Sequence, residues 1–114
     1  MKYYLSAILL MLALPSHAIW HSTTAKVKSI STYSGMETIL VNLESDGIAV
    51  NECSNKATFA ISKNISAEAR ARMYAMLLSA EATGKAISVA YADVGSCEPL
   101  GSTPNVYRTI LRMN

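Results

Sequence analysis

The chain has 114 residues, of which 51% are hydrophobic and 16% are charged, and its formal net charge at pH 7 is +2. This length allows one small domain. So small a net charge excludes the strongly basic or acidic surfaces that binding to nucleic acid or to anionic membranes requires.

Residues 1–18 have the layout of a secretory signal peptide. Lys2 precedes an apolar run from Leu5 to Leu14, and small residues, Ser16 and Ala18, stand at the usual cleavage offsets. The apolar run is too short to span a bilayer well. We expect cleavage after Ala18, which leaves a mature chain of 96 residues with a net charge of +1. Such a protein is secreted or periplasmic.

The first part of the mature chain predicts a β-hairpin. Residues 25–33 are rich in β-branched and aromatic residues. Val27 and Ile30 would lie on opposite faces of a regular strand, which predicts a bulge or a strong twist. Ser34-Gly35 is a turn signal. A second strand over residues 36–43 alternates, and one of its faces carries Ile39, Val41 and Leu43.

Residues 57–62 predict a third strand, and a helix follows it. Ser66 is a suitable N-cap, and Glu68 lies in the first turn, where the helix dipole favours an acidic group. The helix runs to about Thr83, because Gly84 suits the left-handed position just beyond a helix end.

Two further strands, residues 85–92 and 106–113, complete the chain, with a loop at 95–104 between them. Three strands, one helix and two strands form the element order of the OB-fold, a five-stranded, partly open Greek-key barrel. We therefore expect a mainly β fold with one helix between strands three and four, in a single OB-fold domain over residues 19–114.

Cys53 and Cys97 are the two cysteines of the chain, 44 residues apart. Export to an oxidising compartment predicts a disulfide between them. Closing a loop of this size would stabilise so small a domain by about 4 kcal/mol. There is no Cys-x-x-Cys motif, so the predicted bond is structural.

The predicted helix carries apolar side chains around most of its circumference. The stripe expected to face the core contains Ala69, Met73, Met76 and Ala80, with Leu77 at its side. On the far side, Tyr74 and Leu78 are one turn apart. Either they are ordinary exposed residues among alanines, or they form a patch that packs against another copy of the chain. We favour the second interpretation.

No pattern in the sequence indicates catalysis. His21, the only histidine of the mature chain, lies next to the predicted cleavage site, which is a poor place to hold a general base. Asp46 and Asp93 belong to different turns. Metal-ligand spacing and a glycine-rich phosphate loop are both absent from the sequence. We expect a protein without catalytic residues, metal or cofactor.

Nucleic-acid binding by an OB-fold needs a basic groove with stacking aromatic residues. Arg108 and Arg112 share one predicted strand face, and Lys26 and Lys28 lie together on another strand. We expect these four side chains to be solvated, and we expect no nucleic-acid partner.

Several residues resemble a known family. A Cys-Ser-x-Lys motif at 53–56 precedes the third strand, Tyr74 comes early in the helix, Thr83-Gly84 closes the helix, and Tyr91 follows seven residues later. This combination resembles the receptor-binding B subunits of pentameric bacterial toxins, of the subtilase cytotoxin type and its pertussis-like relatives. The resemblance covers about Cys53 to Gly95, and the first hairpin matches in layout only.

The resemblance implies a secreted OB-fold subunit that assembles as a ring of five, with its helices around a pore in which a catalytic A subunit docks. It also implies binding of sialylated or related glycans by a hydroxyl residue at the start of the first strand and a tyrosine at the end of the fourth. Tyr91 matches this tyrosine, Thr24 is the nearest hydroxyl residue although the family typically has serine, and Glu44 would add a polar contact. Alternatively, Tyr91 is a core or rim residue packed beside Val89.

Two functions remain open on this basis. The first is a non-enzymatic, toxin-B-like protein that self-assembles and binds host glycans. The second is a monomeric periplasmic module that binds or inhibits a protein partner through the barrel face or the Cys97–Asn105 loop.

Overall fold

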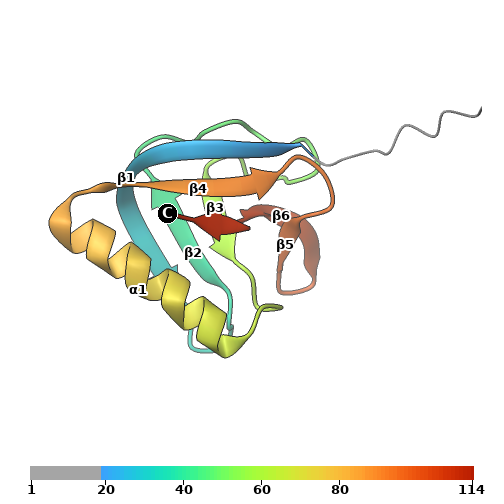
Figure 1. Ribbon diagram of the computed structural model, residues 1–114. Helices are drawn as coiled ribbons and strands as arrows, with labels where there is room; N and C mark the ends of the chain where they lie inside the picture. The colour runs from blue at the N-terminus through green and yellow to red at the C-terminus, as the bar shows by residue number, and fades with distance from the viewer. Residues whose placement is uncertain (1–18) are drawn as a thin grey trace, which may run out of the picture.

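The structure is a computed structural model that describes residues 19–114, so the predicted signal peptide lies outside the described range. The fold is mainly β with a single helix, and all the strands belong to one sheet (Figure 1). The elements are β1 (Trp20–Thr32), β2 (Ile39–Leu43), β3 (Thr58–Ile61), α1 (Ala67–Thr83), β4 (Ala86–Ala92), β5 (Cys97–Leu100), β6 (Thr103–Thr109) and β7 (Arg112–Met113). Within the described range, no helix is long and apolar enough to cross a membrane.

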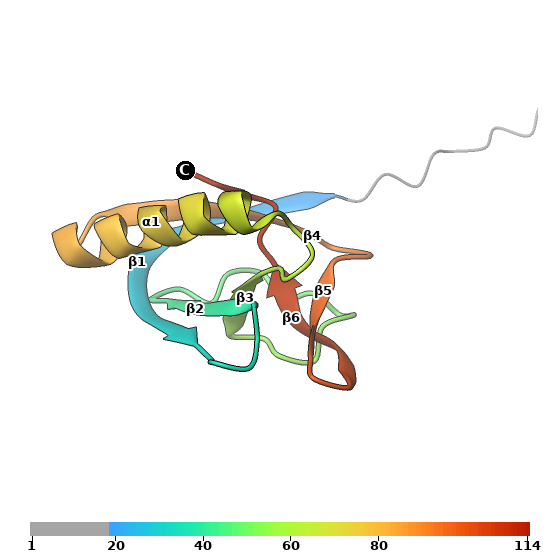
Figure 2. The same cartoon turned by 90° about the horizontal axis from the view of Figure 1, so that it is seen from below.

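β1 is a long strand that takes part in two layers. Its first half, Trp20 to Lys26, pairs antiparallel with β4, and its second half pairs antiparallel with β2. The register shifts between Val27 and Ser29, which confirms the predicted bulge. Figure 2 shows β1 curving from the β4 layer to the β2 layer. The strand begins five residues before its predicted start, because β4 supplies hydrogen-bonding partners for this part of the chain.

The C-terminal segment connects the two sides of the sheet. β6 pairs parallel with β3, and β7 pairs antiparallel with β4. Between them, the amide of Ile110 donates to the carbonyl of Ala60 at 2.8 Å, and the amide of Leu111 donates to the carbonyl of Ala90 at 2.8 Å. The single strand predicted for residues 106–113 is therefore divided where the chain passes from β3 to β4.

β5 is a strand where the sequence predicts a loop. It forms an antiparallel hairpin with β6, with an irregularity between Glu98 and Leu100. Pro99 and the flanking glycines hide this strand in the sequence, because both residue types are typical of turns. The hairpin forms because the β6 backbone offers partners on the side away from β3.

The main core lies between the two layers of strands. The alternation of β2, β3 and β4 supplies it as predicted, with one face of each strand turned inward. Its buried members include Val41, Leu43, Phe59, Ile61, Ile87, Val89 and Tyr91. A second, smaller cluster occupies the other face of β2, β3 and β6 and contains Leu40, Ala60, Val106 and Tyr107.

α1 begins and ends where the sequence predicts. The Ser66 side chain accepts a hydrogen bond from the amide of Ala69 at 3.1 Å, and Gly84 adopts a left-handed conformation with φ of 69°. Leu77 and Ala80 are buried, and Met73 packs against the core. The prediction that Met76 faces inward is wrong, because this side chain is 40% exposed.

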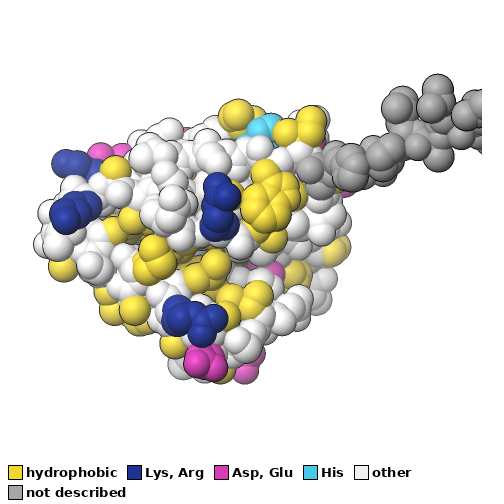
Figure 3. Space-filling view, viewed as in Figure 1, with side chains coloured by type: hydrophobic (Ala, Val, Ile, Leu, Met, Phe, Trp, Pro, Cys, Tyr) yellow, Lys and Arg dark blue, Asp and Glu magenta, His cyan; other side chains and the backbone are white. Residues whose placement is uncertain are grey.

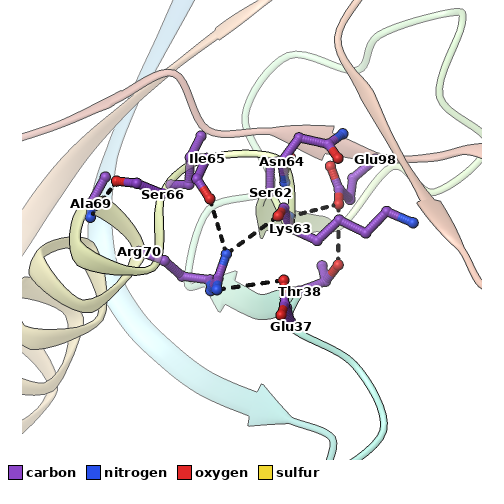
Figure 4. A network of polar contacts seen from close by, with 10 residues as sticks. All are labelled: Glu37, Thr38, Ser62, Lys63, Asn64, Ile65, Ser66, Ala69, Arg70 and Glu98. Carbon is purple, nitrogen blue, oxygen red and sulfur yellow. Dashed lines mark hydrogen bonds and ion pairs between the residues drawn. The ribbon is translucent and has the colours of Figure 1, made fainter.

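A polar network holds the start of α1 against the strands (Figure 4). The buried carboxylate of Glu98 accepts hydrogen bonds from the Thr38 hydroxyl at 3.1 Å and from the backbone amide of Lys63 at 3.0 Å. Arg70 forms an ion pair with Glu37 at 3.6 Å and donates to the Lys63 carbonyl. β5, the segment before β2 and the first turns of α1 are thereby joined.

The predicted disulfide between Cys53 and Cys97 is present, and it joins the segment before β3 to β5. The ammonium group of Lys56 folds back and donates to the carbonyls of Cys53 at 2.6 Å and Val50 at 2.7 Å. The lysine of the Cys-Ser-x-Lys motif therefore stabilises the backbone next to the disulfide.

Candidate ligand-binding site

Tyr91 is fully buried, and its ring packs against Phe59 with 5.0 Å between the ring centroids. The phenol donates a hydrogen bond to the Ile48 carbonyl at 3.0 Å and accepts one from the Ile48 amide at 2.8 Å. Thr23 Oγ1 lies 3.1 Å from the Tyr91 hydroxyl oxygen. Thr23 is the donor in this pair, because the phenol already donates its proton to the Ile48 carbonyl. Tyr91 thus occupies a core position and presents no surface to a ligand in this structure.

The loop that Tyr91 holds, residues 44–49, depends on Gly47. This glycine has φ of 66°, and a Cβ atom at this position would collide with Thr23 Oγ1 and lie 2.8 Å from the Tyr91 hydroxyl. Only glycine fits here without displacing the loop. The loop is therefore pressed closely against the first half of β1 and the end of β4.

Arg108 is fully buried, so the prediction that it is solvated is wrong. Its guanidinium lies 3.9 Å from the centroid of the Phe59 ring, and Nη1 donates to the carbonyls of Asp46 and Ile48 at 2.5 and 3.1 Å. The ring face and the carbonyl dipoles compensate part of the buried charge. The sequence does contain a signal for this position, because Ile110, on the same predicted face, belongs to the core.

Burial lowers the pKa of Arg108, and the Tyr91 phenol and the Asp46 carboxylate oppose this shift. Two of the guanidinium nitrogens, Nε and Nη2, have no hydrogen-bond partner among the described residues. Arg108 therefore carries an uncompensated desolvation cost, and its observed contacts are those that fix the 44–49 loop.

Thr24 and Glu44 are both exposed. The Thr24 hydroxyl forms a hydrogen bond with the Ser88 hydroxyl on β4. The amide of Glu44 donates to the carbonyl of Lys26 at 2.9 Å, which places Glu44 beside the strand two residues from Thr24. The structure brings these two predicted residues to one region, whereas Tyr91 points into the core.

The outer face of β1 continues this region along the strand. Alternate residues are exposed, and they are Trp20, Ser22, Thr24, Lys26 and Lys28. Trp20 is 53% exposed. Figure 3 shows one face of the molecule, on which hydrophobic side chains are interspersed with Lys and Arg and a few acidic side chains lie near the periphery. We call the face formed by Trp20, Ser22, Thr24 and Lys26 the β1 row. It combines an apolar ring, hydroxyl groups and a positive charge.

No catalytic arrangement accompanies the β1 row. The centroids of the His21 and Tyr91 rings are 5.8 Å apart, and the Tyr91 hydroxyl donates its proton to the Ile48 carbonyl in the 44–49 loop. Among residues 19–114, no group of three or more His, Cys, Asp or Glu side chains is placed to hold a metal ion. The row can offer hydrogen bonds and apolar contact to a ligand.

On α1, the structure places the two residues of the predicted patch differently. Leu78 is 45% exposed, whereas Tyr74 is half-buried. Met76 is also exposed, but it is two residues from Leu78 and therefore lies on a different side of the helix, near the start of β4. The apolar outer side of α1 is therefore formed by Leu78, with the half-buried Tyr74 one turn before it.

The comparisons with known proteins do not identify a family. No protein-family model, no curated protein and no solved structure matches the chain.

Proposed function

We propose that this protein is a secreted, non-enzymatic, glycan-binding subunit of the bacterial-toxin B-subunit type, which assembles through α1 into a ring of five. The observation that carries the glycan-binding part is the β1 row. In this row the exposed indole of Trp20 is followed along the strand by the hydroxyl groups of Ser22 and Thr24, and Glu44 lies beside the strand. Binding of a catalytic A subunit would follow from the same assembly.

The strand pairings support an OB-fold barrel as its architecture. β1 pairs with β2 and β4, and the C-terminal segment pairs with β3 through β6 and with β4 through β7. The strands thus form a circuit, with the helix between β3 and β4. This is the order of connections expected of a five-stranded Greek-key barrel in which β6 and β7 together act as the fifth strand.

A glycan fits the chemistry of the β1 row. Sugar rings have an apolar C–H face, which packs on indole, and hydroxyl groups, which pair with hydroxyl and carboxylate side chains. Lys26 offers an ammonium group that can pair with the carboxylate of a sialic acid, and the neighbouring Glu44 can accept hydrogen bonds from hydroxyl groups of the glycan. In this proposal Thr24 and Glu44 contact the ligand, and Tyr91 acts from behind by holding Thr23 and the 44–49 loop in place.

The glycan-binding proposal is tested by applying the oxidised mature protein to a glycan array that contains sialylated and neutral glycans. We expect sialylated glycans to be bound, and we expect Thr24→Ala and Glu44→Gln each to reduce affinity by about tenfold, the value of one hydrogen bond to a charged or polar ligand group. Thr32→Ala removes the same atoms from an exposed position at the far end of β1 and is the matched control. If Thr24→Ala and Thr32→Ala bind the glycan with equal affinity, the β1 row does not bind the glycan.

The assembly proposal is tested by light scattering on a sizing column. We expect a mass close to five protomers, and we expect Leu78→Asp to dissociate the ring because it places a charge in an apolar interface. Ser79→Asp introduces the same charge one residue further along α1, at an exposed polar position, and should leave the mass unchanged. A monomeric wild-type protein would contradict assembly and favour a module that binds a protein partner.

A further inference from the structure

A pocket of about 220 Å³ lies on the outer face of β1, β2, β3 and β6, away from the β1 row. Ser29 and Ser31 line it from the second half of β1, where the bulge has changed which side chains face outward. Asn42 on β2 pairs with Ser29 across the strands, and the Leu40–Tyr107 cluster lies beneath. The bulge therefore separates two outer faces of one strand, one before it and one after it.

Two asparagines give this pocket complementary hydrogen-bonding groups. Asn42 Oδ1 is buried and has no donor among the described residues. Asn55 Oδ1 accepts from the amides of Ala57 at 2.9 Å and Thr58 at 2.8 Å, which leaves its amide nitrogen as the free donor. Thr58 is the cross-strand partner of Asn42, and both asparagines line the pocket. An unpaired acceptor and a free donor in one pocket can both pair with hydroxyl groups of a ligand.

Two tyrosines flank the amide groups. Tyr33 follows the end of β1 and is 53% exposed, and Tyr107 comes from β6, on the other side of β3 and β2 in the sheet order. Tyr107 is buried and forms part of the floor, so Tyr33 is the aromatic ring available to pack on the C–H face of a sugar while the amide groups pair with its hydroxyl groups.

The lining also limits the class of ligand. None of the described residues that line the pocket is Lys, Arg, Asp or Glu. A single-stranded nucleic acid requires cationic side chains along its backbone, and an anionic sugar requires at least one cation to offset the desolvation of its carboxylate. A neutral saccharide requires neither.

We propose that this pocket, lined by Ser29, Ser31, Tyr33, Asn42, Asn55 and Tyr107, binds a neutral hexose unit of a glycan. The inference deepens the proposed glycan-binding function by adding a second subsite with its own sugar class. In an extended glycan, a sialylated end would occupy the β1 row and a separate neutral unit would occupy the pocket.

The test is a titration of the ¹⁵N-labelled, oxidised mature protein, followed by amide chemical shifts. The probes are methyl β-galactopyranoside, methyl α-mannopyranoside, methyl N-acetyl-β-glucosaminide and a methyl α-sialoside. We expect at least one neutral glycoside to shift the amides of Ser29, Ser31, Asn42 and Asn55 in a saturable way. The sialoside should shift the amides around Thr24 instead.

Tyr33 provides matched variants, because its exposed side chain can be changed without opening the core. Tyr33→Ala should weaken binding of the neutral glycoside by about tenfold, since it removes the ring that packs on the sugar. Tyr33→Phe keeps that ring and should bind within about twofold of the wild type. Trp20→Ala should leave this titration unchanged.

Other outcomes separate this inference from the proposed function. If neutral glycosides cause no saturable shift in the pocket while the sialoside still binds at Thr24, the second subsite is overturned and the proposed function stands. If a neutral glycoside shifts the pocket and no sialylated glycan binds the β1 row, the subsite stands without the proposed sialoglycan site. Saturable pocket shifts with a thymidine dodecamer, and none with the glycosides, would overturn the saccharide assignment.

Discussion

Two regions of this molecule are held to the same sheet by different interactions. Beyond the polar network at its first turns, α1 is held by apolar contacts, because Leu77, Ala80 and Met73 pack against the core formed with β1 and β4. The 44–49 loop is held by hydrogen bonds from Tyr91 and Arg108 to its backbone, and Ile48 is 55% exposed. The helix has a wide apolar contact, whereas the loop depends on a few atoms.

The difference lies in how each region responds to change. Apolar packing is not directional, so its loss scales with the volume removed. The loop is positioned by directional hydrogen bonds, so loss of the Tyr91 hydroxyl leaves the amide of Ile48 without its acceptor. The loop begins with Glu44, and its Gly47 lies against Thr23, so a change in the loop reaches the β1 row.

The largest effect is expected at the apolar contact. Leu77→Ala should lower the free energy of unfolding by about 3 kcal/mol, because it leaves a cavity beneath the helix. Leu78→Ala, the next residue on the exposed side, should change the stability of the monomer by less than about 0.5 kcal/mol. Urea unfolding followed by circular dichroism measures both. The measurement is made at a protein concentration at which the ring has dissociated, where similar losses in the two variants would contradict the exposed position of Leu78 in the protomer.

The next effect concerns the loop, at Gly47. Gly47→Ala should cost about 2–3 kcal/mol, because the added methyl meets Thr23 and Tyr91 in addition to the strain of a left-handed alanine. Gly101→Ala has a similar φ of 58° and no atom within 4 Å of the added Cβ, so it should cost about 1 kcal/mol. The difference between the two measures the close approach alone. Equal costs would show that the loop moves freely.

A smaller loss is expected when only the hydroxyl of Tyr91 is removed. Tyr91→Phe should cost about 1–2 kcal/mol, since the amide of Ile48 loses its acceptor while the ring contacts remain. Tyr33→Phe, which removes an exposed hydroxyl, should be close to neutral. Thermal unfolding provides the comparison. If Tyr91→Phe were as stable as the wild type but had lost glycan binding, Tyr91 would contact the ligand directly, and the loop would have to open for it.

The two regions also differ in how well the sequence predicts them. The caps of α1 and most of its buried stripe follow from local signals, Ser66 and Gly84, and from the helical repeat. The position of Met76 does not, because the predicted apolar stripe was too broad to fix the helix rotation to within one residue. The inward faces of β2, β3 and β4 follow from strict alternation.

The loop could not be predicted in the same way. Its contacts join residues more than forty positions apart, such as Tyr91 with Ile48 and Arg108 with Asp46. Arginine is usually exposed, so its residue type predicts that Arg108 is solvated. The only sequence feature that indicates burial is that Arg108 shares its predicted strand face with Ile110, which is buried. β5 depends on the β6 hairpin, which is also invisible in a sequence that contains Pro99 and two glycines. For the candidate site, Thr24 and Glu44 were placed together by β1 pairing, whereas the buried position of Tyr91 was only one of two alternatives.

The smallest effect concerns the start of β1, which supports the β1 row from its outer end. The nitrogen of Ile19 lies 2.9 Å from Asp93 Oδ1, and the amide of Asp93 donates to the Ile19 carbonyl at 3.0 Å. Cleavage after Ala18 would turn this nitrogen into an α-ammonium group and the hydrogen bond into an ion pair.

Asp93→Asn should then lower the free energy of unfolding by less than about 1 kcal/mol, because the pair is exposed to solvent. This loss should shrink between ~10 mM and ~1 M NaCl. The measurement is urea unfolding of protein whose N terminus has been established by mass spectrometry. A chain that keeps one extra residue before Ile19 has no charge at this nitrogen, so there the cost of Asp93→Asn should not depend on salt. A salt-dependent cost in both forms would mean that Asp93 interacts with a charge other than the N-terminal ammonium group.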